Sequence, residues 1–335
     1  MAPGQTGACY VWGRMMRLVG LVLVLVGLCV AASAAEWAPS KERGPRITDK
    51  QLFEMLNLDY VGMEKVKAAV KTGDMNAAKH EFAEYLRHRQ KPLFNKFDPF
   101  SRPKLDKTPD GVDTSEADKI LQRDLASSTV RHKFEGEIDW TLNPINYKEW
   151  TWGFNRHDYW QVLGLAYWQT GEEKYAKEFV YQMTDWVKKC PVPTNDNGNS
   201  GPTWRTIEAG IRMGFSWPVS FYRFLTSPSF TDDAIVTMVT SCAEHAQHLM
   251  RWPTSANWLT METNGLMHVG VLFPEFKDAA LWRKTATERA YSELSKQVYP
   301  DGAQIELSTG YHGAALGNFM EAWDIAHFNG YPMPG

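Results

Sequence analysis

Apolar residues recur at spacings of three and four through most of the second half of the chain, which is the period of an amphipathic helix. Trp160, Leu163 and Tyr167, for example, share one helical face. The strict alternation typical of strands is nearly absent. The pattern predicts helices over 156–170, 174–189, 203–225, 232–251, 257–272, 279–298 and 313–328. Helices of this length joined by short loops favour antiparallel helical hairpins, arranged as a closed or horseshoe-like toroid or as a plain bundle.

The region before this body is also helical, but it is interrupted by turns. Thr48 can cap a helix over 49–56, and further helices are predicted at 63–70, 76–87 and 115–126, with a proline-rich loop at 91–113. We divide the chain into a signal peptide at 1–34, an N-terminal helical segment and loop at 35–138, and a toroid region at 139–335. The chain stops soon after a helical pattern, so we expect the natural protein to continue past Gly335.

The N-terminus carries the pattern of an export signal. Arg14 and Arg17 precede an apolar run over 18–30, and Ala32-Ser33-Ala34 supplies small residues for cleavage. The run is shorter than the roughly 20 apolar residues that a transmembrane helix needs. We therefore expect a periplasmic or secreted protein with no stable membrane span after cleavage. The alternative is an uncleaved N-terminal anchor.

Composition narrows the class of protein. Of 335 residues, 44% are hydrophobic and 22% charged, which indicates a folded globular body. A formal net charge of -3 argues against a protein that binds nucleic acid through a basic face, although a local basic cleft for an anionic substrate is allowed. Cys190 and Cys242 could pair in an exported chain, but they make neither a disulfide framework nor a zinc site. No cofactor is predicted, and the metal content stays open.

The densest polar cluster follows the helix predicted at 279–298. Asp301, Glu306, Tyr311 and His312 fall within a stretch expected to be a loop with a short extended piece. Loops held on rigid helices are where catalytic groups concentrate. The plainer interpretation is a polar connection whose Asp and Glu cap the next helix.

A second cluster opens the helix predicted at 257–272. Asn257 follows a Pro/Ser/Thr loop and could be a helix cap, but its amide could also donate a hydrogen bond to a carboxylate. Trp258 and Glu262 follow it on the same helix. Trp152, Trp204 and Trp258 are candidates for stacking on sugar rings.

A third cluster comprises Arg205, Glu208 and Arg212, spaced so that they share one helix face. They form either an internal ladder of ion pairs or an arginine-lined cleft for a carboxylate or sulfate group.

At these clusters the sequence resembles the heparinase II/III family of polysaccharide lyases. The similarity is carried by Asn155-Arg156-His157 and the helix after it, Trp204 to Arg212, Asn257-Trp258 with Glu262, Asp301-Gly302 with Glu306, and Tyr311-His312. The resemblance implies an incomplete α/α toroid followed by a large antiparallel β-sheet domain, which would lie outside this chain. It also implies β-elimination on a uronic-acid polysaccharide.

The resemblance maps the catalytic tyrosine onto Tyr311 and the carboxylate-binding asparagine onto Asn257. Trp258 stands where some members have a histidine after that asparagine, and a further catalytic histidine of the family belongs to the β-domain. His312 is our third catalytic candidate. Our candidates for substrate binding are the polar and aromatic residues of the three clusters: Arg205, Glu208, Arg212, Trp258, Glu262, Asp301 and Glu306.

The chemistry explains these residue types. An amide such as that of Asn257 stabilises the charge that develops on a uronate when the C5 proton leaves. Tyr311 could protonate the leaving oxygen, or could take the C5 proton if a cation such as Arg205 or His312 lowered its pKa. Two other functions stay open. One is a glycoside hydrolase on a similar toroid that uses carboxylates such as Glu208, Glu262, Asp301 or Glu306, and the other is a non-catalytic module that binds glycans.

Overall fold

The computed structural model describes residues 45–102, 111–331 and 333. The predicted signal peptide, 1–34, lies outside these residues. The first described elements are α2 (Asp49–Met55), α3 (Glu64–Thr72) and α4 (Met75–His88). Thr48 and Gln51 form the reciprocal capping box that begins α2, and left-handed Gly73 ends α3. These helices agree with the predicted ones to within two residues at each end.

A β-hairpin replaces part of a predicted helix. The helix predicted at 115–126 ends early as α5 (Ser115–Leu121), and β1 (Asp124–Ser127) then pairs antiparallel with β2 (Val130–Lys133). Ser128 and Thr129 both have positive φ, as the tight turn of a two-residue hairpin requires. The prediction was wrong here because neither turn residue is the glycine or asparagine that usually marks such a turn. A short 3₁₀ turn, η2 (Pro99–Ser101), lies in the loop predicted at 91–113.

The body consists of long helices in hairpins. Its elements are α6 (Lys148–Phe154), α7 (Tyr159–Thr170), α8 (Glu173–Lys189), α9 (Thr206–Ile211), the π-helical turn η3 (Arg212–Ser216), α10 (Trp217–Phe224), α11 (Asp232–Arg251), α12 (Ala256–Leu272), α13 (Ala279–Gln297) and α14 (Thr309–Phe328). The predicted helix at 203–225 is a continuous rod made of α9, η3 and α10. The predicted start at 156 was wrong, because left-handed His157 separates α6 from α7. The last helix begins before the predicted residue 313, so Tyr311 and His312 lie in its first turn.

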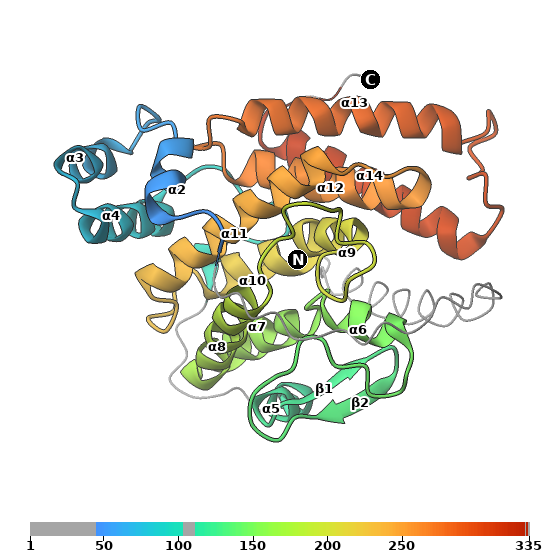
Figure 1. Ribbon diagram of the computed structural model, residues 1–335, viewed down its shortest axis with the longest axis horizontal. Coiled ribbons are helices and arrows are strands. Elements are labelled where there is room, and N and C mark those ends of the chain that lie inside the picture. Colours follow the sequence, from blue (N-terminus) through green and yellow to red (C-terminus); the bar gives the residue numbers. More distant parts are fainter. Residues whose placement is uncertain (1–44, 103–110, 332, 334–335) are drawn as a thin grey trace, which may run out of the picture.

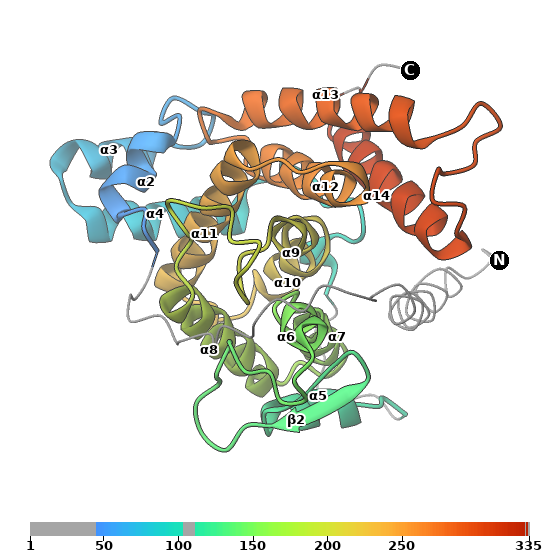
Figure 2. The same ribbon diagram turned by 45° about the vertical axis from the view of Figure 1, so that its right-hand side comes forward.

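The helices curve around the central rod of α9 and α10 as an incomplete toroid (Figures 1 and 2). Helix α12 packs against α9, η3, α13 and α14, while α11 packs against α4, α8 and α12. Arg87 of α4 binds Asp232 at the start of α11 with an Nη1–Oδ1 distance of 2.5 Å. One continuous hydrophobic core contains residues from Leu52 to Ala326, so the predicted N-terminal segment and the toroid share it.

An aromatic cluster fills the interior of the toroid. Trp160, Trp186 and Trp217 have no exposed surface, and the ring of His157 stacks on Trp160 at 4.0 Å between centroids. Truncating a side chain of this size in a packed core typically costs about 3–5 kcal/mol. This rigid interior supports the helix ends that carry the predicted site residues.

Within the described residues, no helix combines the length and apolar character that crossing a bilayer requires. Cys190 and Cys242 are both buried and are not joined to each other.

Candidate active site

Asn257 lies in the first turn of α12 and is 6% exposed. It is not the helix cap, because Ser255 occupies that position. The Asn257 Nδ2 donates to Glu306 Oε1 at 2.5 Å, and its Oδ1 is buried without a hydrogen-bond partner. Ala256, the preceding residue, has a φ of 55°, a conformation that costs a non-glycine residue free energy and is common at functional sites. The capping interpretation of Asn257 is therefore wrong, and its amide faces another segment of the chain.

Glu306 comes from the loop between α13 and α14. The loop is fixed at its base by an isolated bridge between Val298 and Gln304, and Gln304 is buried. Beyond Gln304, Glu306 is exposed, and Leu307 is 78% exposed with a φ of 51°. The tip of the loop thus has little packing, yet its carboxylate reaches the amide of Asn257.

Tyr311 lies in the first turn of α14, directly after this loop, and is partly exposed. Partial burial raises the pKa of its phenol above 10, and the negative charges of Glu306 and Glu149 raise that pKa further. Because all three influences favour the neutral phenol, Tyr311 carries its proton near neutral pH. A neutral phenol is compatible with the acid role predicted for Tyr311, and its catalytic role stays a prediction.

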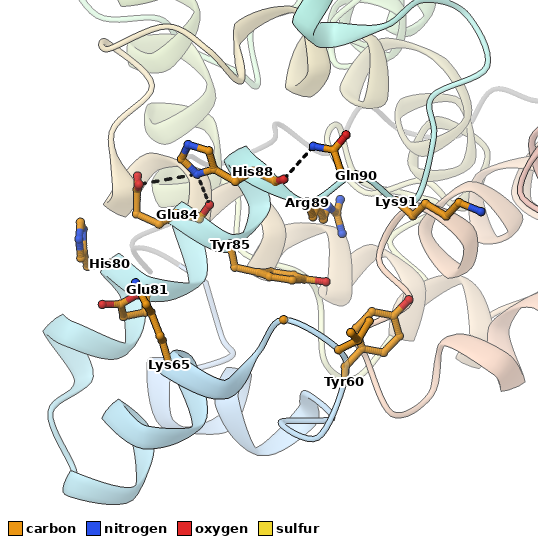
Figure 3. A pocket seen from close by; sticks show the side chains of 12 residues that line it. Tyr60, Lys65, His80, Glu81, Glu84, Tyr85, His88, Arg89, Gln90 and Lys91 are labelled. Carbon is orange, nitrogen blue, oxygen red and sulfur yellow. Dashed lines mark hydrogen bonds and ion pairs between the residues drawn. The ribbon is translucent and has the colours of Figure 1, made fainter.

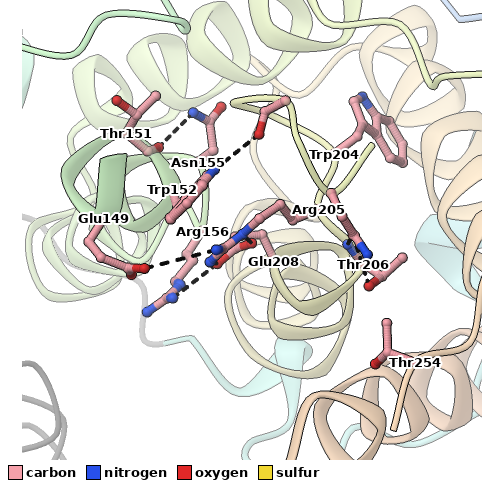
Figure 4. Close-up of polar contacts among 12 residues, drawn as sticks. Glu149, Thr151, Trp152, Asn155, Arg156, Trp204, Arg205, Thr206, Glu208 and Thr254 are labelled. Carbon is pink, nitrogen blue, oxygen red and sulfur yellow. Dashed lines mark hydrogen bonds and ion pairs between the residues drawn. The ribbon is translucent and has the colours of Figure 1, made fainter. Parts of the chain in front are cut away.

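Two arginines share one buried carboxylate at the start of α9 (Figure 4). Glu208 is 1% exposed and accepts bonds from Arg205 Nε at 2.6 Å and Nη2 at 2.7 Å, and from Arg156 Nη2 at 3.0 Å. Burial opposes ionisation of Glu208, but the bonds and charges of the two arginines outweigh it and hold its pKa below the usual value. The carboxylate of Glu149, 3.9 Å from Arg205 Nη1, balances the remaining positive charge of this group.

Arg205 is stacked between two indoles. Its guanidinium carbon lies 3.5 Å from the ring centroid of Trp152 on α6 and 5.0 Å from that of Trp258 on α12. These contacts connect the starts of α9 and α12 through Trp258, the residue that follows Asn257. Of the three tryptophans proposed to stack on sugars, Trp204 is 3% exposed and packs inside the core, whereas Trp152 and Trp258 are partly exposed.

Arg212 belongs to the interior and not to the site. It is fully buried, donates from Nε to His245 Nε2 and from Nη1 to the Asn155 carbonyl, both at 2.9 Å, and lies 4.7 Å from the Trp186 ring centroid. Burial lowers its pKa to about 9. An arginine without exposed surface cannot contact a polysaccharide, so its predicted role in substrate binding is corrected to a structural one.

Glu262 and Asp301 also serve local structure. Glu262 is fully buried and accepts bonds from the backbone and hydroxyl of Thr254, at 2.9 and 2.7 Å, so it fixes the loop before α12. Asp301 is exposed and accepts from the backbone of Ala303 within its own turn. His312 follows Tyr311 on α14, where neighbouring side chains diverge by about 100°. Its catalytic role stays a prediction.

Sequence reasoning did not identify Glu149 and Arg156 as site residues. Glu149 lies on α6, the helix absent from the predicted set, and its carboxylate is 3.9 Å from Arg205 Nη1. Arg156 follows that helix and pairs with Glu208 across 52 positions. The available signals were the aromatic run around Trp150 and Trp152, and the place of Arg156 in the Asn155-Arg156-His157 segment that carries the family resemblance. We define the rim site as Glu149, Trp152, Arg156, Arg205, Glu208, Asn257, Trp258, Glu306 and Tyr311.

In the described part of the chain, neither a metal-binding cluster nor the cavity on α3 and α4 offers a second candidate for the active site. No group of three or more His, Cys, Asp or Glu side chains in residues 45–102 and 111–331 is placed to hold a metal ion. A cavity of about 800 Å³ lies on α3 and α4, at the opposite end of the long axis from the α13–α14 loop (Figures 1 and 3). Its lining mixes Lys65 and Lys91 with Glu81 and Glu84, so it has no clear preference for one charge.

Comparison with known proteins identifies the class. The family described as Heparinase II/III N-terminus matches residues 52–333, so the chain belongs to this family. It is 35% identical over 286 residues to a heparin-sulfate lyase of Pedobacter heparinus, covering 82% of this chain and 42% of that protein. A heparin-sulfate lyase of Bacteroides stercoris is 35% identical over 305 residues, covering 84% of this chain and 44% of that protein.

Solved structures agree with the fold. The crystal structure of a heparan sulfate lyase from Pedobacter heparinus has a TM-score of 0.70 at 33% identity, covering 83% of this chain and 44% of that one. A crystal structure of heparinase III has a TM-score of 0.75 at 26% identity, covering 85% and 44%. The chain thus spans less than half the length of these relatives. The incomplete toroid and the family resemblance are both confirmed.

Proposed function

We propose that this chain is the helical part of a polysaccharide lyase that cleaves a uronic-acid polysaccharide by β-elimination. The observation that carries the proposal is the pairing of an amide and a phenol at adjacent helix starts. Asn257 and Tyr311 are linked through Glu306, which bonds to the first and raises the pKa of the second. The relatives reported above are named heparin-sulfate lyases, and that name supports a substrate that contains uronic acid.

In this mechanism the uronate carboxylate binds at the first turn of α12. The Asn257 Nδ2 donates to it, and the positive end of the helix dipole favours its charge. When a base removes the C5 proton, the electron pair forms the C4–C5 double bond and the bond from C4 to its oxygen breaks. The neutral phenol of Tyr311 gives its proton to that oxygen. The base is either His312 or the histidine that the family resemblance implies in a following β-domain.

The hydrolase alternative has less support, because Glu208 and Glu262 are buried and already accept hydrogen bonds. We also propose, from the sequence of residues 1–34, that the protein is exported to the periplasm or secreted.

The test uses the full-length gene product and a panel of uronic polysaccharides, including heparan sulfate, other glycosaminoglycans and alginate. Ultraviolet absorbance follows the conjugated product of elimination, and a reducing-end assay runs in parallel. We expect both signals to rise together on at least one substrate. New reducing ends without absorbance would indicate hydrolysis, and binding without either signal would indicate a glycan-binding module.

A further inference from the structure

The catalytic amide of Asn257 is already bound to a carboxylate that belongs to the protein. Glu306 Oε1 accepts from Asn257 Nδ2 at 2.5 Å and so occupies one of the two N–H donors of this amide; a uronate on the other would lie beside the Glu306 charge. The other amide atom, Oδ1, is an acceptor and cannot hydrogen-bond an ionised carboxylate. We propose, resting on the proposed function, that Glu306 is a specificity-determining residue that occupies the uronate position in the free protein and must leave it when substrate binds.

The loop around Glu306 is suited to such a displacement. Its base is fixed by the bridge from Val298 to buried Gln304 and by the bond from Ile305 N to the Gln297 carbonyl at 2.8 Å. Glu306 and Leu307 beyond it are exposed, so moving them breaks little packing. The loop can therefore release its carboxylate while its base stays in place.

Backbone strain lies on both sides of this contact. Ala256 directly precedes Asn257 and has a φ of 55°, and Leu307 directly follows Glu306 and has a φ of 51°. Both are non-glycine residues in the left-handed region, and such residues cluster where structures are clamped or switched. The cost of two strained residues is expected where a contact has a function, not in an ordinary surface hydrogen bond.

Charge determines which ligands gain from the displacement. A ligand carboxylate cannot share the Asn257 donor with the nearby negative charge of Glu306 without repulsion. A neutral group at that position also has to displace Glu306, but it meets no charge repulsion. The contact therefore lowers the affinity for uronates more than it lowers the affinity for carboxyl-reduced sugars.

The experiment compares Glu306→Ala and Glu306→Gln with the full-length wild type. The matched control is Glu288→Gln, an exposed glutamate of α13 whose ion pair with Lys284 spans 3.9 Å. Turnover is measured on the uronic polysaccharide that the panel identifies. We expect Glu306→Ala to lower KM about tenfold, as expected when one charged hydrogen bond no longer competes. Because Glu306 also raises the pKa of Tyr311, kcat changes as well, and the fall in KM is the diagnostic result. Glu306→Gln has an intermediate effect, and Glu288→Gln has none.

Binding is measured in the Tyr311→Phe background, with a hexasaccharide of glucuronic acid and N-acetylglucosamine and with its carboxyl-reduced form. We expect Glu306→Ala to tighten binding of the first about tenfold and binding of the second much less. A fall in kcat with unchanged KM, or equal tightening of both ligands, would overturn the inference. Absence of turnover and uronate binding in the wild type would instead overturn the proposed function, so the two failures are distinguishable.

Discussion

Arg205 and Arg212 lie seven positions apart on one helical rod, but the structure uses them in opposite ways. Arg205 lies at the rim, holds Glu208 with two hydrogen bonds and stacks on Trp152. Arg212 lies in the interior, where its partners are the neutral His245 ring and a backbone carbonyl. No carboxylate bonds to it directly.

The difference shows that a charged residue on a helix face does not by itself mark a binding cleft. At the rim, charge is paired with carboxylates: Arg205 is 5% exposed, and the Arg156 side chain, which binds the same Glu208, is 23% exposed. In the interior, burial lowers the pKa of Arg212 and of its neighbour His245, and their packing stabilises the fold. Variants of the two regions should therefore separate stability from catalysis.

Arg212→Ala should have the largest effect on stability. The substitution leaves a cavity among Trp186, Trp204 and His245 and removes the donor to the Asn155 carbonyl. We expect a loss of about 3–5 kcal/mol in the free energy of unfolding, measured by urea denaturation. An Arg212→Ala protein as stable as the wild type, with reduced substrate binding, would show that Arg212 is a substrate-binding residue after all.

Asn257→Ala should affect catalysis and spare the fold. Removing one donor to a developing negative charge typically lowers kcat by about 10²–10³. Because Ser255, not Asn257, is the helix cap, the melting temperature should change little. A lowered melting temperature with unchanged kcat would show that Asn257 serves only the helix.

The buried histidines should make the interior sensitive to acid. Burial lowers the pKa of His268 from 6.5 to about 4, so the folded protein holds it neutral. Below pH 6.5 the unfolded chain binds a proton that the folded chain does not, and stability falls as the pH decreases toward 4. His268 alone lowers the free energy of unfolding by about 3 kcal/mol between pH 6.5 and pH 4, at about 1.4 kcal/mol per pH unit.

His268→Leu should therefore flatten the dependence of unfolding free energy on pH between 6.5 and 4. The burial-raised pKa of Glu244, about 7, acts in the opposite direction and is unchanged by the substitution. Parallel pH profiles for the variant and the wild type would contradict the assignment.

Arg205→Lys should have the smallest effect on stability. A lysine cannot make the two-pronged bond to Glu208 or stack flat on Trp152. We expect a loss of about 1 kcal/mol in unfolding free energy and a raised KM, because the rim loses its planar cation. A lowered kcat with unchanged KM would argue for a role in the chemical step.

Periodicity in the sequence predicted most of the helices, and the family resemblance proposed Asn257 and Tyr311 as catalytic residues. The hairpin at 124–133 was missed because its turn lacks glycine, and α6 was missed because Tyr147, which precedes it, is not a capping residue type. The burial of Arg212 could not be predicted, since equal helical spacing does not specify depth in a toroid. The contact between Asn257 and Glu306 spans 49 positions and depends on how α12 and the α13–α14 loop pack.

The most direct test of the account is turnover of a uronic polysaccharide by Tyr311→Phe, followed as ultraviolet absorbance of the unsaturated product. The variant keeps the ring and removes only the proton that Tyr311 would give to the leaving oxygen. We predict a kcat lower by about 10²–10⁴ with binding of the polysaccharide retained. A Tyr311→Phe variant with the same kcat as the wild type would contradict the assignment of the rim site as the catalytic centre.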